Sequence, residues 1–381
     1  MTAAPRRALT VLIAPDSFKG SLTSLEVARA LAAGWARARP HDAVLLAPLA
    51  DGGEGTLVAI EAAGGWLARE TEVHDPIGRE IRARWLQSAD DSGAIVEMAA
   101  ASGLSRLTTA ERDPLGATTR GTGELLLAAM AAGAHEITLG IGGSATNDGG
   151  AGILRALGAS ISADAVDLAG LDPHLASVDL RIACDVTNPL LGPNGAAATY
   201  GPQKGATLAD VEELDRRLGR FAGALETATR RSERETPGAG AAGGVGFGLL
   251  AIQDRFRSFA LRPGVDLVME ATGFEEKLGR ADLVLTGEGR IDAQTAFGKT
   301  ALGVARRAAA AGRPCIAVGG GVEPDGIAAL AELGVTVVSV AERPQTVEAA
   351  MAAGGAPVER CGERLARLVA LGLGLGAESR A

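Results

Sequence analysis

The sequence contains few cysteines, few aromatic residues and no long apolar run, and these shortages exclude several classes of protein. Three cysteines, Cys184, Cys315 and Cys361, lie far apart in a chain of 381 residues. They form neither a disulfide framework nor the spacing of a metal site, so we expect a reducing, cytoplasmic environment. No stretch approaches the roughly 20 apolar residues of a membrane span, and we therefore expect no membrane association.

The chain also lacks a cluster of basic residues and a histidine motif. Its 37 Lys and Arg residues are outnumbered by 46 Asp and Glu residues, which gives a formal net charge of −9. A nucleic-acid-binding protein needs Lys and Arg gathered on one face, so we expect no nucleic-acid partner. The four histidines follow neither HxH nor HExxH spacing, so none is a good candidate for a metal ligand or a catalytic triad.

Glycine is abundant, and short apolar runs occur near both ends of the chain. Such runs are typical of parallel strands that are buried on both faces of a sheet. Segments with helical spacing of apolar residues lie between them, so the two ends share an alternating strand and helix pattern. The apolar runs are residues 8–14, 43–49, 282–286, 315–318 and 335–340.

The middle of the chain has a different pattern, in which short strands and turns are followed by Gly-rich loops. Two N-terminal strands would be too few to make a stable sheet alone. We therefore predict an α/β protein whose Rossmann-like parallel-sheet domain is discontinuous and built from residues 1–68 and 281–381. Residues 69–280 are expected to form an inserted second α/β domain, with a cleft between the two domains.

Glycine-containing loops follow four of the predicted strands. Three of these loops also carry ionisable residues, and open α/β sheets bind ligands at the edge where their strands end. One such loop would carry little information, but four together predict a ligand site. The loops are residues 15–21, 51–56, 287–292 and 319–321.

Two nucleotide-binding motifs are matched only in part. The segment 238–243 fits GxGxxG, but it follows Pro237 rather than a strand, which favours a flexible loop over a dinucleotide site. The segment 298–300 ends like a Walker A loop, but Ala293 occupies the position of the earlier glycine. Lys299 stays a candidate for a phosphate contact at the start of the following helix.

A Gly-rich segment in the middle of the chain carries several polar side chains. Residues 140–150 combine glycines with Ser144, Thr146, Asn147 and Asp148. Small residues at such a position let backbone N–H groups converge on an anion. The alternative is a tight turn between a strand and a helix.

Asp185 also follows a predicted strand, in the segment from Cys184 to Pro189. A carboxylate at a strand end is a candidate for a general base or a metal ligand. An Asx turn before Pro189 explains the residue about as well.

Several of these segments resemble the bacterial glycerate 2-kinase family. The match runs in order from about residue 9 to residue 370. Two local departures, at 112–114 and 119–123, bear only on the roles of Asp113 and Arg120. The matching strings are APDSFKGSLT from Ala14, ADGGEGT from Ala50, GIGGSATNDGG from Gly140, GPQKGA from Gly201, AGGVGFG from Ala242, TGEGRIDAQT from Thr286, and Gly298 with Lys299.

The resemblance implies an enzyme that phosphorylates D-glycerate with ATP and Mg²⁺, usually at the 2-hydroxyl, to give 2-phosphoglycerate. It also implies a Rossmann-like domain that carries an inserted α/β domain. A 3-phosphoglycerate product and a homodimer stay open. The rival functions are a nucleotide-dependent oxidoreductase, which would need GxGxxG after the first strand, and a non-catalytic organic-acid sensor.

Phosphoryl transfer needs alignment and charge stabilisation more than covalent chemistry, and the candidate residues divide by task. Asp185 is our first choice for the general base that accepts the hydroxyl proton, and Asp292 is the second. Either Arg79 or Arg112 is expected to bind the glycerate carboxylate as a bidentate partner. The catalytic candidates are Asp185, Lys19 and Asp292.

The remaining candidates would bind the substrates and the metal. The substrate-binding residues expected besides the two arginines are Asp16, Ser17 and Asn188. The metal ligands expected are Asp51, Glu54 and Asp148. The residues expected to bind the nucleotide and its phosphates are Gly142, Gly143, Ser144, Thr146, Asn147, Lys204, Gly243, Gly244, Glu288 and Lys299.

Overall fold

The computed structural model describes residues 7–162, 165–293, 295 and 300–378. The chain divides into two compact units. The first unit comprises Met1–Asp51, Val58–Gly64 and Val268–Ala381, and the second comprises Gly52–Leu57 and Gly65–Leu267. The domain boundaries that we predict at residues 68 and 281 stay a prediction.

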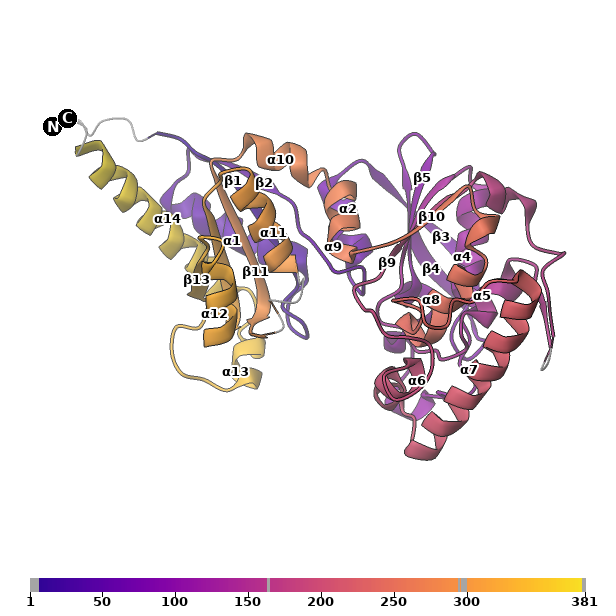
Figure 1. The fold of residues 1–381 in the computed structure, drawn as a ribbon. Coiled ribbons are helices and arrows are strands. Elements are labelled where there is room, and N and C mark those ends of the chain that lie inside the picture. The colour runs from indigo at the N-terminus through magenta and orange to yellow at the C-terminus, as the bar shows by residue number, and fades with distance from the viewer. Residues whose placement is uncertain (1–6, 163–164, 294, 296–299, 379–381) are drawn as a thin grey trace. The chain divides into compact units, whose positions relative to one another are not determined.

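The first unit is built on a five-stranded sheet that takes strands from both ends of the chain (Figure 1). All four pairings are parallel, and Ile13 of the central region lies opposite Leu285 on one side and Leu46 on the other. The apolar runs of the sequence form these strands. The three central strands bury most of their side chains, as expected for strands covered on both faces, whereas the edge strands Ala43–Leu46 and Thr336–Ser339 stay partly exposed. In sheet order the strands are β13 (Thr336–Ser339), β12 (Cys315–Val322), β11 (Leu283–Ile291), β1 (Thr10–Pro15) and β2 (Ala43–Leu46).

Helices with amphipathic faces accompany this sheet. The first, α1 (Ser24–Ala38), begins at a capping box in which Thr23 and Glu26 satisfy each other's backbone N–H groups. It packs closely on α14 (Ala356–Glu378), drawn in yellow in Figure 1, since a Cβ on Gly34 would lie 1.8 Å from the Glu359 carbonyl oxygen. The other helices with residues in this unit are α2 (Thr56–Ala63), α9 (Gly264–Ala271), α10 (Phe274–Arg280), α11 (Thr300–Ala310), α12 (Pro324–Ala331) and α13 (Val347–Ala352).

The second unit contains a six-stranded mixed sheet. Four neighbouring strands are parallel and end at one edge, whereas the two strands at one side form an antiparallel hairpin. A separate two-stranded ribbon joins β7 (Ser160–Ile161) to β8 (Val166–Asp167). In sheet order the six strands are β10 (Ser258–Arg262), β9 (Asp179–Ala183), β6 (Glu136–Gly140), β5 (Gly93–Glu97), β4 (Glu80–Ser88) and β3 (Trp66–His74).

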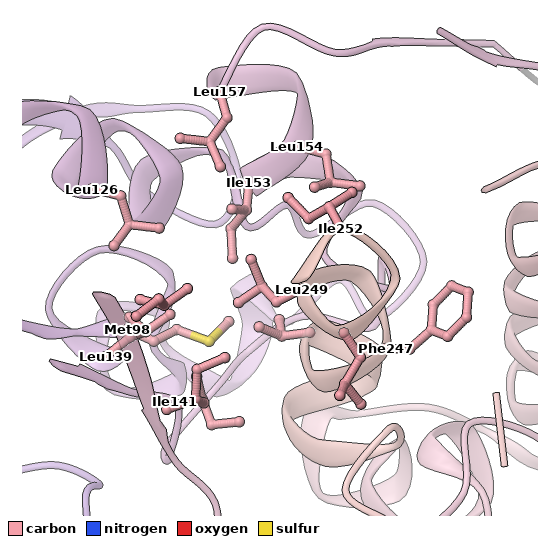
Figure 2. Packing of buried hydrophobic residues seen from close by; sticks show 14 of the residues in the cluster. Met98, Leu126, Leu139, Ile141, Ile153, Leu154, Leu157, Phe247, Leu249 and Ile252 are labelled. Carbon is pink, nitrogen blue, oxygen red and sulfur yellow. The ribbon is translucent and has the colours of Figure 1, made fainter. Parts of the chain in front are cut away.

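The core of the second unit lies between this sheet and its helices (Figure 2). The helices are α3 (Met98–Ser102), α4 (Arg120–Ala131), α5 (Ala151–Ala156), α6 (Ala196–Tyr200), α7 (Leu208–Thr229) and α8 (Ala241–Ala251). Their apolar side chains meet those of β6 in one cluster. Figure 2 labels Met98, Leu126, Leu139, Ile141, Ile153, Leu154, Leu157, Phe247, Leu249 and Ile252 of this cluster.

The helix α8 corrects one expectation: the segment 238–243, for which we expect a flexible loop, leads into a helix, and residues 236–248 carry no apolar periodicity that would mark it. The helix is buried on almost every side, and a helix without a solvent face has no polar stripe to set a period. Its first turn is irregular: Ala242, Gly243 and Gly244 have positive φ angles of 54°, 70° and 90°. Regular helix therefore begins only after these three residues.

The α/β class with parallel sheets is confirmed by both units. Among the described residues, no helix has the length and apolar character needed to cross a membrane.

Candidate active site

The first unit gathers ionisable side chains at the edge where its strands end. Asp16 directly follows β1 and is only 8% exposed. One carboxylate oxygen accepts a hydrogen bond from the Ser17 backbone N–H at 2.6 Å, and the other accepts one from Thr300 Oγ at 2.6 Å. Burial raises the pKa of Asp16 above its usual value, and the hydrogen bond from Thr300 opposes that rise.

Lys19 brings a cation to the same group. Its Nζ lies 3.3 Å from Asp51 Oδ2, and the lysine side chain is 78% exposed. The charge of Asp51 is the largest cause that raises the pKa of Lys19, and the charges of Asp16 and Glu288 act in the same direction. A fully charged, accessible ammonium is therefore held among three carboxylates.

Glu288 and Asp292 belong to the segment 287–292, which we expect to be a loop. The structure corrects this, because β11 continues to Ile291, and the expected loop at 319–321 likewise lies within β12. Glu288 lies within β11, is 6% exposed, and accepts a hydrogen bond from Thr295 Oγ at 2.8 Å. The Asp292 backbone N–H donates to the same Thr295 hydroxyl at 3.1 Å, and the Asp292 carboxylate lies 3.3 Å from Arg290 Nε. Thr295 thus ties the two acidic residues together. Lys299 lies outside the described residues.

The predicted metal ligands do not form a closed cage. Within residues 7–162, 165–293, 295 and 300–378, no three His, Cys, Asp or Glu side chains converge closely enough to hold a metal ion. Asp51 lies in the first unit and Glu54 in the second. Mg²⁺ commonly binds one or two carboxylates together with the phosphates of its nucleotide, and Asp51 beside Asp16 offers such oxygen atoms.

In the second unit, the 140–150 loop joins β6 to α5 and buries its polar side chains. Ser144 is 8% exposed, Thr146 0% and Asn147 4%. Thr146 Oγ has no hydrogen-bond partner among the described residues. The loop packs against the irregular turn of α8, since a Cβ on Gly243 would lie 1.9 Å from the Thr146 carbonyl oxygen. Only glycine at 243 allows this approach.

Lys204 supports this loop from the interior of the unit. The residue is 1% exposed, and its Nζ donates to the Thr146 carbonyl oxygen at 2.5 Å and lies 3.5 Å from Asn147 Oδ1. Burial lowers the pKa of Lys204 to about 7, although the charge of Asp148 acts in the opposite direction. The contacts that the structure shows are with the loop, and a direct phosphate contact stays a prediction.

The buried ammonium should make stability depend on pH. An unfolded lysine binds its proton up to pH 10.5, whereas the folded Lys204 releases it above pH 7. The unfolded state therefore binds more protons between these values, so the free energy of unfolding should rise with pH. We therefore compare the free energies of unfolding of wild type and Lys204→Met by chemical denaturation between about pH 7.5 and 9.5. The value for wild type minus the value for Lys204→Met should increase by about 1.4 kcal/mol per pH unit.

A matched control is Lys277→Met, in which the lysine also donates to a backbone carbonyl, that of Thr272 at 2.8 Å, but is only half buried. Its difference from wild type should change much less with pH. A pH-independent difference for Lys204→Met would mean that the lysine stays charged in the folded protein.

Asp148 uses its carboxylate to fix the same loop. One oxygen accepts hydrogen bonds from the Thr119 backbone N–H, the Thr119 hydroxyl and the Gly152 N–H, at 2.9–3.0 Å. The other accepts one from the Gly150 N–H at 3.0 Å. These donors favour a structural role for Asp148, and its place among the metal ligands stays a prediction.

Asp185 and Asn188 follow β9. They lie at the edge of the second sheet where β6 also ends and the 140–150 loop begins. The Asp185 residue is exposed, and one of its oxygens accepts a hydrogen bond from the Gly264 N–H at 3.1 Å, at the start of α9. Both ends of the Asn188 side-chain amide are hydrogen-bonded. Its oxygen accepts from Tyr200 Oη at 2.7 Å, and its nitrogen donates to the Asn194 carbonyl at 2.8 Å. Asp185 is thus accessible, whereas Asn188 is held by its neighbours.

The two candidate arginines differ in how many hydrogen bonds their guanidinium groups make. Arg79 directs Nε to Asp75, one terminal nitrogen to Glu111 at 2.7 Å and the other to the Arg106 carbonyl at 3.2 Å. Arg112 makes one long contact, 3.3 Å to the Gln203 carbonyl. Its Nε is buried without a partner among the described residues.

Glu97 is a further buried carboxylate that belongs to none of the sequence motifs. It ends β5, is 6% exposed, and accepts backbone hydrogen bonds from Gly55, Thr56 and Leu57. Burial raises its pKa to about 7. Its only signal in the sequence is a single charged residue at the end of an apolar strand.

The structure therefore gathers the predicted residues in two groups, one in each unit. The first group is Asp16, Ser17, Lys19, Asp51, Glu288 and Asp292, to which Thr295 and Thr300 add unforeseen hydroxyl groups. The second is the 140–150 loop with Lys204, Gly243 and Gly244. Glu54, Asp185, Asn188 and the two arginines also belong to the second unit.

Comparisons with known proteins agree with the resemblance seen in the sequence. The profile of the glycerate kinase family matches residues 11–370. A glycerate kinase from Halalkalibacterium halodurans is 43% identical over 374 residues, which cover 94% of this chain and 97% of that protein. The glycerate 2-kinase of Escherichia coli strain K12 is 44% identical over 333 residues, with 83% of this chain and 86% of that protein covered.

A solved structure gives the same answer for the fold. The crystal structure of a protein assigned as glycerate kinase 2 from Salmonella typhimurium LT2 superposes with a TM-score of 0.83 at 41% sequence identity. The match covers 96% of this chain and 99% of that one. The chain therefore belongs to the glycerate kinase family of phosphotransferases.

Proposed function

We propose that this protein transfers the γ-phosphoryl group of ATP to the 2-hydroxyl of D-glycerate, giving 2-phosphoglycerate and ADP. Family membership and the names of the curated relatives support the substrate and the reaction. The structural observation that carries the proposal is the accessible Lys19 ammonium among Asp16, Asp51 and Glu288 at the sheet edge. Phosphorylation of the 3-hydroxyl is the alternative outcome.

In the proposed reaction, the oxygen of the glycerate hydroxyl attacks the γ-phosphorus, and Asp185 accepts the proton of that hydroxyl. The new P–O bond forms while the bond to the β-phosphate oxygen breaks, and the electron pair leaves with ADP. The support for this role is that Asp185 is an exposed carboxylate at a strand end, anchored by the Gly264 N–H at 3.1 Å. Asp292, whose carboxylate lies 3.3 Å from Arg290 Nε, stays the second choice.

The charge of the transferring group needs compensation. We assign this task to Lys19, whose ammonium is accessible and fully charged. Backbone N–H groups of the 140–150 loop and of the turn at Gly243 and Gly244 would contact the nucleotide phosphates. Mg²⁺ bound with ATP would neutralise phosphate charge. Asp51 is the candidate ligand in the first unit, and Glu54 and Asp148 are the candidates in the second.

Arg112 is the better candidate for the glycerate carboxylate. Arg79 already directs all three guanidinium nitrogens to protein acceptors. Arg112 has a buried Nε without a partner among the described residues and only one long contact. A bidentate arginine–carboxylate pair would use these donors.

Replacing the two arginines in turn should separate a binding role from a structural role. We expect Arg112→Ala to raise the KM for glycerate by about 10- to 100-fold, the size of a lost charged hydrogen-bond pair. Arg79→Ala should lower the melting temperature, because it leaves the fully buried Asp75 without its cation, and should leave that KM unchanged. If steady-state kinetics instead shows a raised KM for glycerate in Arg79→Ala and an unchanged KM in Arg112→Ala, the glycerate carboxylate binds at Arg79.

The proposed function is tested by an ADP-release assay on the purified full chain. ATP, Mg²⁺ and D-glycerate together should give rapid ADP release, whereas omission of glycerate should abolish it. NADH titrated in parallel should produce no binding signal. A folded protein that binds glycerate or ATP but releases no ADP would favour the non-catalytic sensor. A cytoplasmic location and a homodimer stay predictions.

A further inference from the structure

A buried carboxylate in the second unit connects two of the glycine-rich loops. Glu97 is the last residue of β5 and is 6% exposed. The next residue, Met98, is 0% exposed and is anchored in the apolar core shown in Figure 2. The backbone at Glu97 is therefore fixed by the strand on one side and by the core on the other.

The side chain of Glu97 binds residues 52–57, a loop together with the first two residues of α2, which we call the 52–57 loop. The backbone N–H groups of Gly55, Thr56 and Leu57 donate to its carboxylate, with 2.9 Å between Gly55 N and Oε1. Besides these three N–H groups, the negative charge of Glu54 acts on Glu97 and raises the pKa of its carboxyl group further. Three N–H donors from one short segment thus replace water around a buried carboxyl group, so Glu97 and the loop depend on each other.

The backbone of Glu97 is tied to the 140–150 loop. Glu97 lies opposite Gly140 in the parallel pairing of β5 with β6. The two loops also touch directly, because a Cβ on Gly140 would lie 2.5 Å from the Gly52 carbonyl oxygen, and a Cβ on Gly142 would lie 2.5 Å from Gly53 Cα. Glycine at 140 and 142 is required for this approach, and Glu97 is the side chain that holds the other loop in place.

We propose that Glu97 is a positioning residue for phosphoryl transfer, which holds the 52–57 loop with Glu54 against the phosphate-binding 140–150 loop. The role in transfer rests on the proposed function, whereas the anchoring of the loop rests on geometry alone. Residues that orient metal-binding or phosphate-binding groups in this way typically change affinity or activity by about 10- to 100-fold when altered.

Glu97→Gln is the sharpest test, because it keeps the size of the side chain. An amide has one oxygen acceptor, and its NH₂ group would face N–H donors, so at least one N–H group of the loop loses its partner. We expect amide hydrogen exchange in peptides that span residues 52–57 to speed up by about 10-fold or more. We also expect kcat/KM for Mg²⁺–ATP to fall by about 10- to 100-fold. Glu97→Asp keeps both acceptors and should recover part of each effect.

Asp179→Asn provides a matched control at the opposite edge of the same sheet. Asp179 begins β9 and accepts hydrogen bonds from Arg257 at 2.8 Å and Ser258 at 2.7 Å. This variant should lose stability without a change in exchange at residues 52–57 or in kinetics at a temperature where it is folded. If Glu97→Gln fails to fold, Glu97→Asp is compared with this control instead.

Two results would overturn the proposal. Unchanged exchange at residues 52–57 would mean that Glu97 does not hold the loop. Faster exchange with unchanged kinetics would mean that the position of the loop does not matter for transfer. A wild-type protein without glycerate-dependent ADP release would instead reject the proposed function, while the exchange data would still report on the anchoring by Glu97.

Discussion

Replacing Asp185 with Asn should lower kcat by roughly 10²–10⁴-fold, the range for loss of a general base. Asparagine is nearly isosteric with aspartate and can still accept the hydrogen bond from the Gly264 N–H, which lies 3.1 Å from Asp185 Oδ1. The local structure should therefore persist, while the proton of the glycerate hydroxyl loses its acceptor. Steady-state kinetics with saturating ATP and glycerate measures this effect.

The affinity for nucleotide separates this role from the alternative. Asp185→Asn should barely change the KM for Mg²⁺–ATP if the residue is the base. A variant with wild-type kcat and weak Mg²⁺–ATP binding would instead make Asp185 a metal ligand. The base would then have to be sought at Asp292, which lies 3.3 Å from Arg290 Nε and hydrogen-bonds to Thr295 through its backbone.

Lys19→Ala should reduce turnover by orders of magnitude, roughly 10²–10³-fold, as expected when one positioned charge donor at a transferring group is removed. The protein should remain folded, because the Lys19 side chain is 78% exposed and pairs with a partly exposed Asp51. Exposed ion pairs of this kind contribute little to stability. Single-turnover kinetics together with a thermal melt measures both quantities on one preparation.

Arg37→Ala is the corresponding control in the first unit, since Arg37 also makes exposed ion pairs, with Glu359 and Glu363, but belongs to α1. It should leave turnover unchanged. If Lys19→Ala keeps wild-type turnover and wild-type stability, Lys19 is only a solvated loop cation, and the positive charge must come from elsewhere.

Much of the first unit could be predicted from the sequence, for a clear physical reason. Strands of a parallel sheet consist of short apolar runs, and the five runs near the chain ends form the five strands of one sheet, although only the three central strands are mostly buried. The capping box at Thr23 and Glu26 likewise marks the start of α1. The helix α8 could not be predicted, because a helix buried on nearly all sides has no polar face to set a period.

The sequence could not show which candidate residues would bind a substrate and which only stabilise the loops. Loop position alone cannot distinguish an accessible lysine from a buried one, yet Lys19 is exposed and Lys204 is 1% exposed. The partners that decide such roles are distant in sequence. Thr300 donates to Asp16 across 284 positions, and Glu97 accepts from Gly55 across 42, so no local pattern announces either contact.

The position of the new phosphate ester tests the central claim most directly. The full chain is incubated with D-glycerate, ATP and Mg²⁺, and the product is examined by ³¹P and ¹³C NMR. We predict a single product whose phosphorus couples to the carbon and proton at C2, which identifies 2-phosphoglycerate. Phosphate at C3 would contradict the proposed regiochemistry, and the absence of any phosphorylated glycerate from a folded preparation would contradict the kinase assignment itself.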